Sequence, residues 1–190
     1  MLILIGGIVL FFGAHSVSVL APFWRDRMVL LVGPLQWKGL YALISAAGFV
    51  GLVWGYADAR QTPAIIYLPP FWLRYATFVL MLPVFPLVLA TYLPGKIKTA
   101  ARHPLLAATI LWASAHLLSS GSLAAVLLFG SFLAWAVVDR ISLQRRVPAA
   151  IPMLPNWRFN DAIAVSGGLA LYVLFVWRLH LWLFGVQPLV

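Results

Sequence analysis

Six apolar stretches constrain the fold of this chain of 190 residues more than any other feature. A helix needs about 20 apolar residues to cross the hydrocarbon core of a bilayer, within a usual range of about 17–25. Four stretches meet that length and two are short; together they cover residues 2–23, 39–57, 71–93, 105–120, 122–138 and 162–185. We therefore predict an all-α integral membrane bundle of about six transmembrane helices, forming one domain over residues 1–190.

The composition leads to the same class of protein. Hydrophobic residues make up 64% of the chain, charged residues make up 9%, and the mean hydropathy is +1.00. A soluble domain is about half apolar and about a quarter charged, so a lipid bilayer must cover much of this surface. The net charge of +9 does not predict a nucleic-acid partner, because the cations lie in short segments between apolar runs. The absence of cysteine excludes disulfides, thiolate ligands and covalently attached c-type haem.

The two short stretches are separated only by the sequence Ser-Ser-Gly-Ser at residues 119–122. This is a turn signal inside an otherwise continuous apolar run. We predict that spans four and five form a tight, short hairpin. One long buried helix and a re-entrant pair remain open as alternatives.

The distribution of Lys and Arg predicts the orientation. Ten cations lie in the odd-numbered connections, and three lie elsewhere, at Arg60, Arg74 and Arg178. Because cytoplasmic loops carry the excess of Lys and Arg, both termini are expected on the non-cytoplasmic side, in a bacterial inner membrane. The first stretch lacks a positively charged start and continues into Trp24-Arg25-Asp26-Arg27, so we do not interpret it as a cleavable signal peptide.

Three local patterns have structural interpretations. Gly51-x-x-x-Gly55 predicts close helix packing on the second span. Pro83 and Pro86 predict a kink in the third span. Asn160-Asp161 is typical of an N-cap, here for the last helix.

Four histidines are the candidates for chemistry, because ionisable side chains inside a span are costly and are functional candidates by default. His15 lies in the first span, and His116 lies near the outer end of the fourth. His103 precedes Pro104 at the start of that fourth span, and His180 lies in a Trp-rich stretch that favours interfacial anchoring. His103 and His116 are about 220° apart around a helix, so they occupy different faces.

Neutral imidazole is an axial ligand of b-type haem, and helix bundles hold haem through such residues. A proton relay is an alternative, but it usually uses intramembrane carboxylates, and the predicted spans contain none. No Ser–His–Asp set falls at one depth, which argues against a hydrolase. Simple hydrogen bonding of His15 and His116 to neighbouring helices remains equally open.

Several segments together resemble the NnrU family. They are Lys96–Leu106, Leu111–Leu118, Gly121-x-Leu123, Leu128-Phe129-Gly130, His15-Ser16 and Gly39-Leu40-Tyr41. The resemblance covers nearly the whole chain and is most specific at residues 96–132. Members of the family are small multi-span proteins linked to nitrite and nitric oxide metabolism in denitrification. Zeta-carotene isomerase is a relative that uses a b-type haem held by two histidines.

The resemblance implies haem b with His15 and His116 as axial ligands and Trp112 beside the second. It implies catalytic roles for Arg102 and His103 at the mouth of the site. The resemblance leads us to expect a haem-dependent cis–trans isomerase or oxidoreductase acting on a hydrophobic small molecule, or a nitrogen-oxide related protein. His15 lies roughly 20 Å from the outer edge and His116 about 7 Å, so His103 remains an alternative partner for His15.

Two other functions stay open. Arg102-His103-Pro104 also resembles a motif of isoprenylcysteine-type membrane methyltransferases, which bind S-adenosylmethionine. Those enzymes carry an acidic, Arg-containing segment after the hairpin, whereas this chain has Val138-Asp139-Arg140 and no glutamate. The family link also allows a non-enzymatic assembly factor for nitrogen-oxide reductases.

Overall fold

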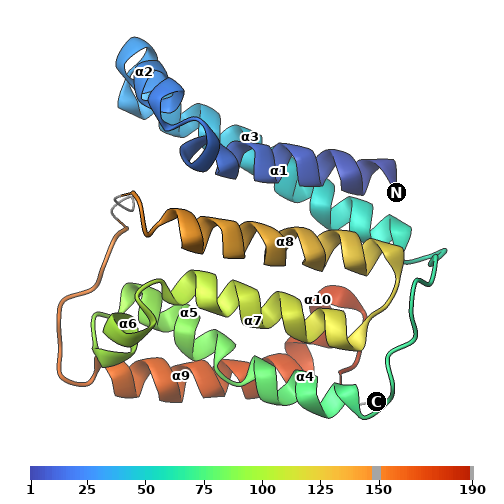
Figure 1. The fold of residues 1–190 in the computed structure, drawn as a ribbon. Helices are drawn as coiled ribbons and strands as arrows, with labels where there is room; N and C mark the ends of the chain where they lie inside the picture. Colours follow the sequence, from blue (N-terminus) through green and yellow to red (C-terminus); the bar gives the residue numbers. More distant parts are fainter. Residues whose placement is uncertain (147–150, 189–190) are drawn as a thin grey trace. The chain divides into compact units, whose positions relative to one another are not determined.

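The computed structural model describes residues 1–146 and 151–188, and these residues are mainly helical, with longer irregular connections between Ala59 and Leu73 and before Asn160 (Figure 1). The described residues contain no strand, only an isolated bridge between Ile65 and Ser122. The elements are α1 (Leu2–Leu20), α2 (Pro22–Val32), α3 (Pro34–Ala59), α4 (Leu73–Met81), α5 (Val84–Tyr92), α6 (Lys96–Ala101), α7 (Pro104–Ser119), α8 (Leu123–Ser142), α9 (Asn160–Leu174), a π-helical turn (Phe175–Leu179) and α10 (His180–Phe184). The predicted all-α class is confirmed.

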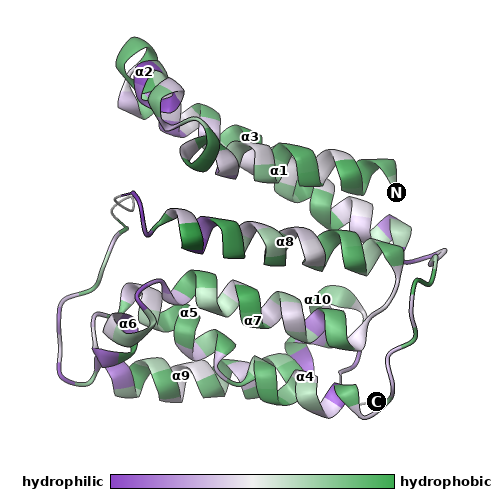
Figure 2. Cartoon of the chain, viewed as in Figure 1, coloured by the Kyte–Doolittle hydropathy of each residue, from purple (hydrophilic) through white to green (hydrophobic). Residues whose placement is uncertain are grey.

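Within the described ranges, five helical segments are long and apolar enough to cross a membrane, and α7 is a shorter apolar helix. The five are Leu2–Leu20, Pro34–Ala59, Leu73–Tyr92, Leu123–Ser142 and Asn160–Phe184. Hydrophobic colours dominate these helices, with hydrophilic residues gathered mainly at their ends and in the connections (Figure 2). The six segments coincide with the six predicted apolar stretches, and the chain is an integral membrane protein.

The chain divides into two compact units. Unit 1 consists of Met1–Pro70 and Ser120–Arg145, and unit 2 consists of Phe71–Ser119 and Arg146–Val190. The division separates α7 from α8, so the hairpin of spans four and five stays a prediction. Each unit is described below by itself.

Unit 1 is built on close backbone contact between α1 and α3. Gly48 packs against Phe11, and a Cβ atom added at Gly48 would lie 2.6 Å from the Phe11 backbone nitrogen. Gly51 contacts Gly7, and Gly55 contacts Leu4. The predicted packing role of Gly51-x-x-x-Gly55 is confirmed, and its partner is the first span. Helix α8 adds aromatic contacts, including Phe132 at 5.7 Å from Phe11 and 4.9 Å from Phe12 between ring centroids.

Unit 2 is built from interrupted helices. The third span breaks after Met81, and α5 begins at Val84, directly after Pro83, which confirms the predicted proline kink. Proline lacks the backbone N–H, and near the break the Tyr172 hydroxyl of α9 donates to the Phe78 carbonyl at 3.2 Å. The Thr77 hydroxyl donates to the Ala115 carbonyl at 3.0 Å, which links α4 to α7.

The predicted N-cap of the last helix is wrong. Asn160 is the first residue of α9, and its amide donates to the carbonyls of Pro94 at 2.8 Å and Pro155 at 3.1 Å. Asp161 accepts hydrogen bonds from the backbone nitrogens of Lys96 and Ile97, at 2.8 and 3.0 Å. Both side chains therefore form hydrogen bonds with backbone atoms of segments packed against α9, and Asp161 caps the N-terminus of α6.

Candidate functional site

His15 lies on α1 in unit 1, half-buried among aromatic rings. Its ring stacks on Phe11 with centroids 4.2 Å apart and planes inclined by 26°. Tyr41 from α3 lies 5.3 Å away, and Trp135 from α8 lies 5.7 Å away with its plane nearly perpendicular. Three helices thus hold this imidazole in a mainly apolar setting.

The Nδ1 atom of His15 lies 2.7 Å from the Phe11 carbonyl oxygen, one helical turn earlier. A carbonyl oxygen can only accept, so Nδ1 carries the proton and donates it. In the neutral ring, Nε2 then keeps its lone pair. The local helix geometry therefore leaves Nε2 as the unprotonated ring nitrogen of His15.

A buried carboxylate lies on α8, the helix that carries Trp135. Asp139 is only 8% exposed, and it lies one turn after Trp135 on the same face of α8. Tyr41, which contacts His15, is within electrostatic range of Asp139. The predicted span ends at Val138, whereas α8 continues to Ser142 and so includes Asp139.

Trp135 contributes a further polar atom to the surroundings of His15. Its indole Nε1 is buried and has no hydrogen-bond partner among residues 1–146 and 151–188. A buried donor without an acceptor costs about 1–3 kcal/mol, so such an atom is a candidate contact for a bound molecule.

His116 lies on α7 in unit 2 and repeats the local geometry of His15. Its Nδ1 atom donates to the Trp112 carbonyl at 2.8 Å, which again leaves Nε2 as the unprotonated nitrogen. The Trp112 ring lies 5.2 Å away between centroids. The predicted common face of Trp112 and His116 is confirmed.

His180 also belongs to unit 2, where it opens α10 directly after the π-helical turn. Its Nδ1 atom lies 2.8 Å from the Val186 carbonyl, and its ring contacts Phe184 at 5.1 Å. It is close enough to His116 for a charge on one ring to act on the other. Short π-helical segments frequently occur at functional sites, which makes His180 a candidate that the sequence reasoning assigned only to anchoring.

Arg102 and His103 form a strained turn between α6 and α7. Among the described non-glycine residues, only Arg102 has a positive φ, with φ 59° and ψ −51°. The His103 nitrogen donates to the Ala101 carbonyl at 2.7 Å, which makes Arg102 the centre of a three-residue γ-turn. Such strain costs about 1–3 kcal/mol and concentrates at functional sites. This supports a role for the Arg102-His103-Pro104 motif.

The structure does not bring this motif together with His116. His116 lies thirteen positions after His103, which corresponds to about 20 Å along α7. The Arg102 side chain is exposed and His103 is half-buried. The two predicted groups of unit 2 residues, the ligand His116 and the catalytic pair, therefore occupy opposite ends of one helix.

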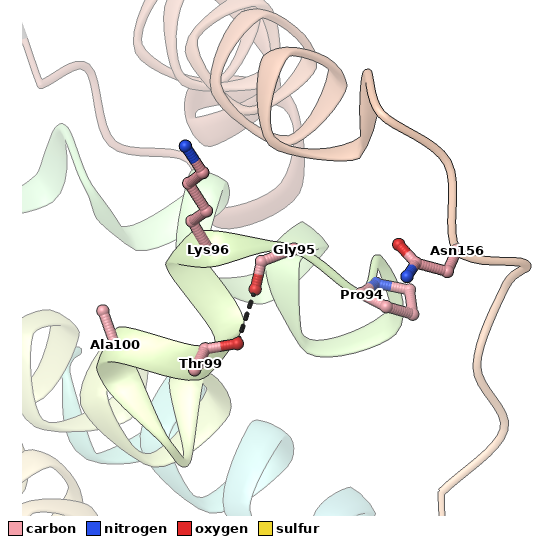
Figure 3. A pocket seen from close by; sticks show the side chains of 6 residues that line it. All are labelled: Pro94, Gly95, Lys96, Thr99, Ala100 and Asn156. Carbon is pink, nitrogen blue, oxygen red and sulfur yellow. Dashed lines mark hydrogen bonds between the residues drawn. The ribbon is translucent and has the colours of Figure 1, made fainter.

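A surface hollow of about 550 Å³ lies beside α6 (Figure 3). It is lined by Pro94, Gly95, Lys96, Thr99, Ala100 and Asn156. The Thr99 hydroxyl donates to the Gly95 carbonyl at 3.0 Å, and Lys96 extends away from Asn156 (Figure 3). The four histidines are not among its lining residues, so the hollow is separate from the candidate ligand atoms.

Comparison with known proteins identifies the family. A family model described as "NnrU protein" matches residues 3–188, and the chain belongs to the NnrU family. It is a membrane protein of a family linked to nitric oxide and denitrification. No curated protein and no solved structure matches it.

Proposed function

We propose that this member of the NnrU family binds b-type haem through Nε2 of His15 and Nε2 of His116. The observation that carries the proposal is the shared geometry of the two rings: each Nδ1 donates to the carbonyl one turn earlier, at 2.7 and 2.8 Å. A histidine that ligates a metal usually donates its other ring N–H in this way, because the bond sets the tautomer and the ring orientation.

The residues around the rings fit haem. Phe11, Tyr41 and Trp135 surround His15 with the apolar, aromatic surface that a porphyrin needs, and Trp112 does so at His116. When bound, the iron would supply Lewis-acid or redox chemistry. The chain's own part is to orient the imidazoles and to exclude water. We propose an isomerase or oxidoreductase of a hydrophobic small molecule, or of a nitrogen oxide, in a bacterial inner membrane.

Arg102 and His103 are proposed to act on substrate rather than to hold iron. The strained γ-turn fixes their backbone, and the exposed guanidinium of Arg102 can reach a polar or anionic group on a bound molecule. The proposed positions of the termini, outside the cytoplasm, would place this turn on the cytoplasmic side.

The absorption spectrum of the detergent-purified, haem-supplemented protein tests the proposal. The native protein should show a Soret band, and His15→Ala and His116→Ala should each remove most of it because each loses an iron–nitrogen bond. His103→Ala should keep the band and reduce activity. Circular dichroism of every variant checks that the helices are intact.

His180→Ala is the informative control, since Nδ1 of His180 also bonds a backbone carbonyl, that of Val186, and the residue lies within electrostatic range of His116. We expect it to keep the Soret band. Loss of the band in His180→Ala with retention in His15→Ala would contradict the ligand assignment. Absence of any band in folded protein, with heat released on titrating S-adenosylmethionine, would instead support the methyltransferase alternative.

A further inference from the structure

The connection after the first span is a helix rather than an irregular loop. Helix α2 follows α1 after Ala21 alone, and Gly33 turns the chain into α3. Gly33 has φ +90°, a conformation that side-chain-bearing residues rarely adopt, so a sharp turn here depends on glycine. Trp24 of α2 packs against Trp37 of α3, with ring centroids 5.8 Å apart. The two helices therefore form a small helical hairpin.

Charges on α3 indicate the depth of this hairpin in the membrane. Between Lys38 and Asp58, α3 contains no charged residue, and this interval spans about 30 Å. That length matches the hydrocarbon core of a bilayer. By this length we expect residues 34–38, and α2 packed beside them, to lie beyond the hydrocarbon core, at the level of the lipid headgroups.

Large apolar side chains are nevertheless exposed on this hairpin. Phe23 is 89% exposed, Leu30 is 86% exposed and Leu35 is 78% exposed. None of the residues of α2 is buried. Contact of these side chains with water would be unfavourable, so an apolar surface must cover them.

Cations lie on the same hairpin. Arg27 and Lys38 are exposed, and no side chain among the described residues pairs with either. Arg25 is paired with Asp26 at 2.7 Å. An apolar surface bordered by free cations is complementary to a membrane interface that carries negative headgroups, with acyl chains next to phosphates.

We propose that the α2 hairpin, residues 22–38, lies in the membrane interface and binds anionic lipid headgroups. Leu30, Leu31 and Leu35 enter the boundary between headgroups and acyl chains, while Arg27 and Lys38 contact phosphates. Trp24 and Trp37 lie at the depth that tryptophan prefers in bilayers. Each basic residue near an anionic surface strengthens such contact by about fivefold.

The chain has no cysteine, so one introduced thiol can report on this surface. In the Leu31→Cys variant, an environment-sensitive fluorophore is attached to the new thiol. The full-length protein is then reconstituted in vesicles of phosphatidylcholine alone, or of phosphatidylcholine with about one third phosphatidylglycerol, which makes the vesicle surface anionic. We expect blue-shifted emission and quenching by brominated acyl chains, both stronger with phosphatidylglycerol. The double change Arg27→Gln and Lys38→Gln should remove at least half of that lipid dependence.

Gln61→Cys is the matched control, because Gln61 is exposed just beyond the other end of α3. Its label should respond equally in both vesicles. Emission from Leu31→Cys that stays typical of water would overturn the proposal, as would quenching that is identical with and without phosphatidylglycerol. Formation of a disulfide-linked dimer by the unlabelled Leu31→Cys protein would assign the surface to a second copy of the chain instead. The substituted residues are exposed, so thermal unfolding should match that of the parent.

Discussion

The two units of this protein pack their helices in different ways. In unit 1, α1 and α3 approach until their backbones touch, at Gly7, Gly48, Gly51 and Gly55. In unit 2, the helices are shorter or interrupted, and side chains such as Thr77 and Asp161 bond to the backbone of a neighbouring segment. Lipid tails supply no hydrophobic drive between spans, so a membrane protein must use close packing or polar bonds. Unit 1 relies on close packing between α1 and α3, and unit 2 uses both, because Gly168 of α9 also meets the backbone of Pro86 in α5.

The two kinds of contact are disrupted by different substitutions. Adding a side-chain atom forces closely packed backbones apart, whereas removing a polar side chain breaks a hydrogen bond between neighbouring segments. The three predictions below separate these mechanisms, using the free energy of unfolding measured in mixed detergent micelles.

The largest effect should come from Gly48→Ala in unit 1. The new methyl group would meet the backbone of Phe11, which cannot move as a flexible side chain does, so α1 and α3 must separate. We expect a loss of about 2 kcal/mol or more. Gly39→Ala on the same helix is the control; nothing lies within 4 Å of its Cβ, so the higher helix propensity of alanine should stabilise by up to about 1 kcal/mol. Equal effects at both positions would refute the packing mechanism.

Asp161→Ala should have the next largest effect, in unit 2. The change leaves the backbone nitrogens of Lys96 and Ile97 without their carboxylate acceptor, so α6 loses its attachment to α9. We expect a loss of about 1.5–3 kcal/mol. Ser166→Ala serves for comparison, because that hydroxyl bonds only the Ala162 carbonyl of its own helix. Faster hydrogen exchange confined to α6 would locate the effect, and unchanged exchange there would argue against it.

Thr77→Val should have the smallest effect. It removes the hydrogen bond from α4 to the Ala115 carbonyl while keeping the volume of the side chain. Polar bonds between membrane helices contribute about 0.6 kcal/mol on average, and we expect a loss of that size. Thr109→Val is matched to it, since Thr109 bonds only the Leu105 carbonyl one turn earlier. A loss as large for Thr109 would mean that the interhelical bond contributes nothing.

The two candidate ligands differ in how much of their surroundings the sequence predicts. His15 lies among rings from three helices of unit 1, and His116 contacts the ring of Trp112 on its own helix. The sequence predicted both residues and the face shared by Trp112 and His116, because residues four apart on a helix are neighbours. It could not predict that Tyr41 and Trp135 contact His15, since these residues come from other helices.

Several features were readable from the sequence alone. The six apolar stretches, the break at Pro83 and the packing role of Gly51 and Gly55 all follow from local rules. In lipid, each backbone N–H and C=O must be satisfied within its own helix, so the length of an apolar run directly predicts a span. Proline and glycine act at their own positions, and their effects need no knowledge of the partner.

Only the tertiary structure decided which side chains meet across the chain. Asp161 caps α6 instead of its own helix, Asp139 of α8 lies within electrostatic range of Tyr41 of α3, and His180 lies within electrostatic range of His116. Each of these relations joins residues that are dozens of positions apart. The rotation and depth of one helix against another determine them, and these depend on the packing of whole helix surfaces rather than on any local pattern.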